Sequence, residues 1–304
     1  FGRFAGFFTG WTYWLECTLC IMAEITAIGA YVQFWAPGFP KWITSLICLI
    51  VLVGINLLGV KYYGELEFWF SIIKVVAIIG MIAMGSLMIF LGVANGGHAI
   101  GLSNLWSNGG FFPNGIKGFL LSFILVTFGF GGVELIGSTA GEAEDPKKSI
   151  PKSINSVFWR ILIFYIGSMI VMLSLYKWNE IGVDGSPFVF IFDKVGIPYA
   201  ASIINFVVIT AALSSMNSCL YVNGRILYSL SLNNNAPKAF SKISKSGIPY
   251  VGILFTTLVV ACVVILNYIV PGQVFTYISS IATLAVLTAW ATILLTQLKS
   301  RKEK

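Results

Sequence analysis

The sequence contains few charged residues and a single histidine. Asp, Glu, Lys and Arg make up only 10% of its 304 residues and 57% are hydrophobic, whereas soluble domains carry about 25% charged residues. The mean hydropathy is +0.88, and apolar runs of the roughly 20 residues that a helix needs to cross a bilayer recur along the chain. This composition excludes a soluble enzyme and indicates an integral membrane protein.

Residues that bind metals or catalyse reactions are equally scarce. A structural metal site needs about four ligands, yet the only histidine, His98, lies in a loop between apolar runs. The cysteines all fall within apolar segments, where they are expected to be small packing residues. The sequence contains no phosphate-binding Walker motif and no evident nucleophile–base pair. We therefore expect no metal, no cofactor and no enzymatic activity.

The positive charge of the chain is distributed in a way that indicates membrane orientation. A net charge of +7 suggests nucleic acid only when the cations gather on a soluble face; here they lie in loops between spans, so no nucleic-acid partner is expected. With residue 1 in the cytoplasm, 14 Lys and Arg residues lie inside and four outside. The positive-inside rule favours this orientation over its reverse, with the tail 299–304 also in the cytoplasm.

The hydrophobic pattern predicts an all-α polytopic protein with eight transmembrane helices in the bilayer. The expected spans lie at about 4–36, 42–60, 68–92, 118–140, 157–176, 200–231, 249–270 and 273–298. Between the fifth and sixth spans, the stretch Ser186–Val195 is expected to form a short amphipathic helix outside the membrane. Because the chain starts abruptly at the foot of a span, we expect a fragment of a longer protein.

The fourth span carries a cluster of glycines in the stretch TFGFGGVELIG. Every backbone polar group inside hydrocarbon needs a partner, so a helix can unwind there only beside a cavity or buried against protein. Gly129, Gly131 and Gly132 would permit unwinding near mid-membrane, and glycine-interrupted spans are typical of transporter binding sites. Close packing of two helices through small residues is the alternative explanation.

Three ionisable residues lie well inside spans: Glu134, Glu24 and Lys74. Such residues are costly in hydrocarbon and are functional candidates by default, so we assign them to proton coupling. Glu134 alternatively serves as a protonated acid bonded to a neighbouring helix. Lys74 alternatively extends its ammonium group to the inner membrane surface.

The sixth span contains a polar belt in the stretch TAALSSMNS. Ser214 and Asn217 share one helix face because they are three residues apart. They are candidates for the lining of a substrate path, although hydrogen bonding between helices is the commoner role of such residues.

The loop after the fourth span reads GEAEDPKKSIPKSIN. Its acidic residues Glu142 and Asp145 precede Lys147, an arrangement that could close an inner gate through ion pairs. The alternative is a solvated loop whose prolines and charges mark the start of a helix.

Several long stretches resemble the bacterial amino acid permeases of the amino acid–polyamine–organocation superfamily. They include GWTYWLECTLCIMAEITAIGAYVQFW, GELEFWFSIIKVVAII, FGFGGVELIGSTAGEAEDPKKSIPKSINSVFWRILIFY and NFVVITAALSSMNS. The resemblance covers essentially the whole chain. It implies a partial inverted-repeat fold, with residues 1–92 as part of the first repeat, 93–117 as an outer loop and 118–298 as the second repeat, so that the first two and last two family spans are missing.

The resemblance also implies a function. The stretch Phe128, Gly129, Phe130, Gly131 and Gly132 falls on the family's broken helix, whose carbonyls receive the α-amino group of the substrate, and Glu134 falls on a family glutamate. The implied activity is import of a neutral L-amino acid, such as proline, threonine or serine, with protons across the bacterial inner membrane. Amino acid exchange, a channel and a truncated protein that does not transport are the alternatives, and the oligomeric state is left open.

Overall fold

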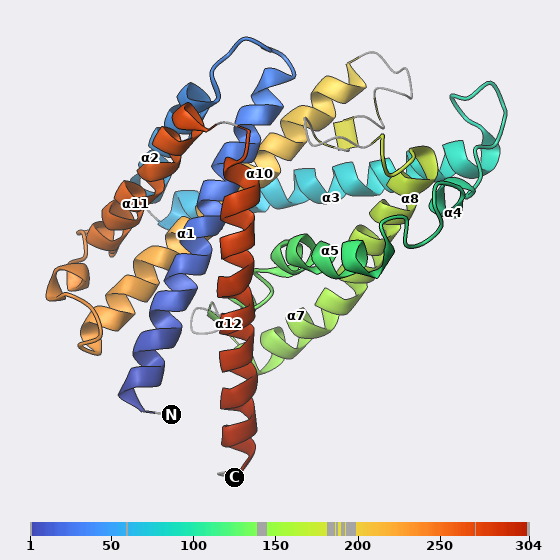
Figure 1. Cartoon of the computed structure of the whole chain (residues 1–304). Coiled ribbons are helices and arrows are strands. Elements are labelled where there is room, and N and C mark those ends of the chain that lie inside the picture. The colour runs from blue at the N-terminus through green and yellow to red at the C-terminus, as the bar shows by residue number, and fades with distance from the viewer. Residues whose placement is uncertain are drawn as a thin grey trace. The chain divides into compact units, whose positions relative to one another are not determined.

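A computed structural model describes residues 2–58, 60–138, 145–180, 186, 188–189, 192, 199–270 and 272–302. All regular elements within these ranges are helices (Figure 1). The expected all-α class is therefore confirmed. Most of the amphipathic helix expected at Ser186–Val195 lies outside the described residues.

The helices follow one another along the chain with short connections. Their bounds are α1 Arg3–Gln33, α2 Lys41–Leu58, α3 Val60–Leu91, α4 Asn104–Ser107, α5 Gly115–Phe130, α6 Leu135–Ser138, α7 Pro146–Arg160, η2 Ile161–Ile166, α8 Gly167–Leu175, α10 Ala200–Leu232, η3 Lys238–Ser241, α11 Tyr250–Ile269 and α12 Val274–Lys302.

Six helical stretches of the described chain are long and apolar enough to cross a membrane, and α2 and α5 are shorter apolar helices. Each of the eight predicted spans therefore contains a helix. Together these helices make the chain a multi-pass membrane protein.

The fifth span begins earlier than the hydropathy pattern predicts. We expected its start at about residue 157, but α7 already begins at Pro146. Asp145 caps this helix, since its side chain accepts a hydrogen bond from the backbone N–H of Lys148, and proline fits the first turn because the N–H groups there have no partner within the helix. The residues that we took for a loop thus form the polar first turns of a long helix.

The same span contains a π-helical stretch, η2, between α7 and α8. Wide turns of this kind are rare and occur often at functional sites. Hydrophobic periodicity gave no indication of it, because a single wide turn barely changes an apolar pattern.

The chain forms two compact units, and their boundaries fall inside helices. The first unit comprises Phe1–Phe70, Ile124–Gly131 and Ala211–Lys304; the second comprises Ser71–Phe123 and Gly132–Thr210.

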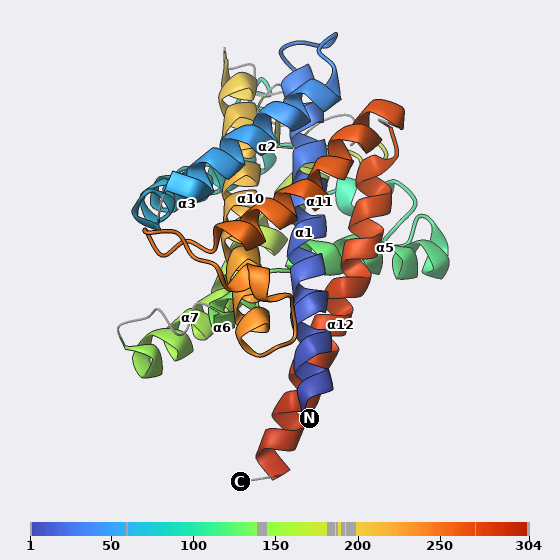
Figure 2. The ribbon, with the colours of Figure 1, turned by 90° about the vertical axis from the view of Figure 1, so that its left-hand side faces the viewer.

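In the first unit, α1 packs along α12 and also contacts α2 and α11 (Figures 1 and 2). Its middle is buried, with Ile21 and Ile25 wholly inaccessible. The helices α10 and α11 approach through two glycines: a Cβ placed on Gly252 would lie 3.2 Å from the carbonyl oxygen of Gly224. Small residues permit such backbone contact between membrane helices.

Buried polar side chains tie the helices of this unit together. Trp14 Nε1 donates to Thr256 at 2.9 Å, and Asn223 donates to Thr18 at 3.0 Å. Asn267 of α11 donates to Thr26 at 3.1 Å and to Ser45 at 3.3 Å, which joins three helices. These bonds satisfy groups that lipid cannot.

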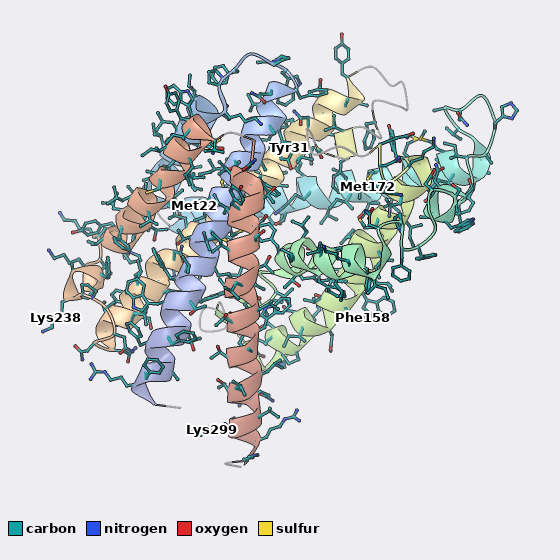
Figure 3. All side chains as sticks on the ribbon, in the orientation of Figure 1. Met22, Tyr31, Phe158, Met172, Lys238 and Lys299 are labelled. Atoms are coloured by element: carbon teal, nitrogen blue, oxygen red, sulfur yellow. The ribbon has the colours of Figure 1, made fainter. Side chains whose placement is uncertain are left out.

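In the second unit, α3 packs against α8 through a methionine-rich cluster. Its buried members are Met81, Met88, Ile89, Val171, Met172 and Leu175, of which Figure 3 labels Met172. Gly85 allows this approach, since a side chain there would overlap Val171. Asn104 of α4 donates to the carbonyl of Ser174 at 2.9 Å, which fixes α4 against α8.

Candidate functional site

The fourth span is broken where the glycines lie. The helix α5 ends at Phe130 and α6 begins at Leu135. Gly131 N–H donates to the carbonyl of Phe128 at 3.1 Å, which tightens the last turn. Gly132 has a φ of 94°, a left-handed conformation that glycine adopts without strain. The break predicted from the sequence is therefore present.

Glu134 stabilises the turn of which it is part. Its Oε1 accepts a hydrogen bond from the backbone N–H of Gly132 at 2.9 Å, and the side chain is half-buried. A carboxylate that accepts from a backbone N–H makes a stronger bond than a neutral acceptor. Glu134 thus supports the backbone that departs from the helix, a role that sequence reasoning did not foresee.

The inner end of α5 is held by α12 within the first unit. Thr283 Oγ1 donates to the carbonyl of Ile124 at 2.8 Å, and the rings of Phe128 and Phe275 meet edge to face at 6.5 Å. A Cβ on Gly131 would lie 3.1 Å from Val286 Cγ2. Side chains of α12 therefore fix the point at which the helix stops.

The end of α5 has a defined polarity. The last turn of any α-helix leaves carbonyl groups without a partner inside the helix, and these carry partial negative charge. In hydrocarbon they must be satisfied by protein, water or a ligand. The arrangement can therefore bind a cationic group such as an ammonium.

A second acidic residue, Glu16, lies beside the break. It belongs to α1 and is 5% exposed, and its Oε1 is 3.9 Å from the position that a Cβ on Gly131 would occupy. Sequence reasoning regarded Glu16 as too shallow for the site. An acidic residue within the apolar run of α1 was the available signal.

The structure connects Ser214 and Asn217 of α10 to α2 and α3. Ser214 Oγ donates to Glu67 Oε1 at 2.6 Å, and Asn56 Nδ2 donates to Asn217 Oδ1 at 2.8 Å. The shared face of the two residues is thus the one that the spacing predicted. Glu67 and Asn56 are polar partners that the sequence analysis did not single out.

Glu24 and Lys74 lie in different units. Glu24 is half-buried on α1, where it is close enough to Cys20, Cys219 and Tyr31 for electrostatic interaction. Lys74 is half-buried on α3 in the second unit.

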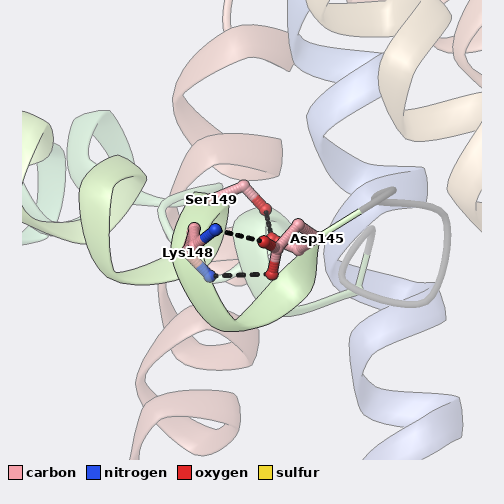
Figure 4. A network of polar contacts seen from close by, with 3 residues as sticks. All are labelled: Asp145, Lys148 and Ser149. Atoms are coloured by element: carbon pink, nitrogen blue, oxygen red, sulfur yellow. Dashed lines mark hydrogen bonds and ion pairs between the residues drawn. The ribbon is translucent and has the colours of Figure 1, made fainter.

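The contacts of Asp145 are those of a helix start (Figure 4). Its carboxylate pairs with Lys148 Nζ at 3.3 Å, and its carbonyl accepts from Ser149 Oγ at 2.7 Å. Lys147 is exposed on the same first turn of α7. Glu142, the other residue assigned to a gate, lies outside the described residues.

Comparison with known proteins gives the family. The family model described as "Amino acid permease" matches residues 1–304. The chain belongs to this amino acid permease family. Members of it are transporters, so the resemblance seen in the sequence is confirmed.

Several bacterial relatives are similar over nearly the whole chain. An uncharacterised amino acid permease of Bacillus subtilis, YtnA, is 55% identical over 99% of this chain. The probable threonine/serine transporter YbxG of the same bacterium is 48% identical over 99%, and the aromatic amino acid transport protein AroP of Escherichia coli K12 is 46% identical over 100%. The chain spans 65 to 66% of the length of these relatives.

Proposed function

We propose that this permease imports a neutral L-amino acid across the bacterial cytoplasmic membrane, with the substrate bound at the break between α5 and α6. The observation that carries this proposal is the end of α5 at Phe130, followed by a turn that only glycines allow. Family membership supports an amino acid as the substrate. The carbonyl end of α5 would receive the ammonium group, and Phe128 to Gly132 would line the pocket.

The relatives named above support a neutral side chain, because one is named for threonine and serine and another for aromatic amino acids. Within this range we propose threonine, serine or proline. Competition by a panel of unlabelled amino acids against labelled L-threonine uptake would rank them.

We further propose that protons drive the uptake, with Glu134, Lys74 and Glu24 as the coupling groups. Protonation of Glu134 would weaken its bond to the Gly132 N–H, because a neutral acid is a poorer acceptor than a carboxylate. A proton would thereby alter the turn at the substrate site. One charge crossing the membrane is worth about 2.3 kcal/mol per 100 mV, which suffices for uphill uptake.

The membrane orientation and the internal repeat complete the proposal. The Lys and Arg distribution favours residue 1 and the tail 299–304 in the cytoplasm, and Lys299, Arg301 and Lys302 occupy the last turn of α12. Residues 1–92 and 118–298 would form the two repeats. Asp145 and Lys147 would then lie at the inner surface, where they could contribute to a gate.

The test is uptake of labelled L-threonine, L-serine and L-proline into liposomes that contain the protein. Accumulation under an imposed pH gradient, without internal amino acid, is the expected result. Uptake only into liposomes preloaded with amino acid would indicate exchange. The absence of both would contradict transport by this chain.

A further inference from the structure

The carboxyl group of Glu16 lies where the chain already concentrates negative charge. Glu16 is 5% exposed on α1, and its Oε1 is 3.9 Å from the Cβ position of Gly131, immediately after the last residue of α5. The C-terminal end of a helix carries about half a negative charge. A buried carboxylate beside this end is costly unless a positive partner neutralises it.

The backbone next to Glu16 is unusually accessible for a membrane helix. A Cβ on Gly129 would meet no atom within 4 Å, and Gly131 likewise carries no side chain. The two glycines therefore leave room beside the helix end for a small group. Because Glu16 and the end of α5 belong to the same unit, their proximity is part of one packed structure.

We propose that Glu16 binds the ammonium group of the substrate, together with the terminal carbonyls of α5. This assignment rests on the proposed function and deepens it, since it names a residue from a different helix that recognises the amino group. The ammonium would neutralise both the carboxylate and the helix end. The site would then require a substrate with a positively charged nitrogen and reject its deaminated counterpart.

The proposal is tested by Glu16→Gln, which keeps the size of the side chain and removes its charge. Binding of L-threonine, L-serine and L-phenylalanine to the purified protein is compared with binding of the deaminated counterparts 3-hydroxybutanoate, 3-hydroxypropanoate and 3-phenylpropanoate. Bonds to charged groups are worth about 1.5–3 kcal/mol, so the Kd of the amino acids should rise on the order of 10- to 100-fold. The Kd of the deaminated acids should change less than about threefold.

A matched control separates this effect from a general loss of charge. Glu180→Gln makes the same chemical change at an exposed residue whose partner is Lys177, at 3.3 Å, and should leave all affinities unchanged. Glu16→Asp keeps the charge, so it should retain the preference for the amino group even at reduced affinity. This variant also provides the test if Glu16→Gln does not fold.

The outcomes distinguish the two proposals. If the unmodified protein binds amino acids and Glu16→Gln weakens both ligand classes equally, or neither, Glu16 does not bind the ammonium group. The same conclusion follows if Glu16→Asp loses the preference. If the unmodified protein binds no amino acid, the proposed function fails and this assignment fails with it.

Discussion

At the residue scale, the polar side chains of this membrane protein mostly bond to other helices. Asn267 illustrates this, because its amide group donates both to Thr26 on α1 and to Ser45 on α2. Ser214 does the same toward Glu67 on α3. Such bonds determine which helix faces meet, since lipid offers no competing partner.

Replacing Asn267 with Ala should destabilise the protein. The change removes both donated bonds and leaves Thr26 and Ser45 without this partner, a loss of about 1–3 kcal/mol. Thermal unfolding in detergent is the measurement, with Asn233→Ala as the control, because Asn233 is exposed and bonds only locally to the carbonyl of Ser229. An equal effect of both variants would contradict a role in joining the helices.

Glu134→Gln should abolish accumulation driven by a pH gradient while exchange continues. The amide oxygen can still accept from the Gly132 N–H, so the turn persists, but the side chain no longer titrates. The accumulation ratio in liposomes should fall to about one. Glu134→Ala, which also removes the acceptor, should lose exchange as well; full accumulation by Glu134→Gln would exclude this residue from coupling.

The sequence analysis identified several important residues and missed others for a physical reason. Glycine spacing identified the break because backbone conformation depends on local sequence. It could not identify Glu16 as a neighbour of Gly131, since this contact joins residues more than a hundred positions apart. The bonds of Ser214 and Asn217 were likewise hidden, although their shared face was evident.

At the element scale, the end of α5 depends on how closely α12 approaches it. A Cβ on Gly131 would lie 3.1 Å from Val286 Cγ2 and 3.2 Å from the carbonyl oxygen of Phe128. Contacts this short leave no room for a branched side chain. The turn and its neighbour are therefore matched in size.

Gly131→Leu should block uptake without preventing membrane insertion. The leucine would collide with Val286 and fill the space beside Glu16, whereas the apolar run that directs insertion is unchanged. Initial uptake rates and the amount of protein in the membrane are measured together. Gly54→Leu is the control, because a Cβ at Gly54 meets no atom within 4 Å; unchanged uptake kinetics in Gly131→Leu would contradict a site at the break.

Helix positions were predictable to a few residues, but their starts and internal irregularities were not. Hydropathy marks the lipid-facing part of a helix, so it placed the fifth span at 157 and missed the polar turns that follow the Asp145 cap. It also gave no sign of η2. The cap residues were recognised as a possible helix start, which the structure supports through the bonds of Asp145.

At the scale of the whole molecule, hydropathy and family membership agree on a multi-pass transporter. The orientation rests on the positive-inside rule. A fluorescent reporter fused after α12 should fluoresce in the cytoplasm, and an alkaline phosphatase fused at the same place should be inactive. The reverse pattern would invert the proposed topology, and with it the direction in which Glu134 meets protons.

The π-helical stretch η2 has a consequence for tolerance to changes in chain length. A wide turn holds one residue more than an α-turn, so deleting one residue from Ile161–Ile166 would restore regular winding. Every side chain beyond it would then swing by about 100° around the axis relative to α7. Val171 would turn away from the notch at Gly85, so this short segment should be far less forgiving of a deletion than of a substitution.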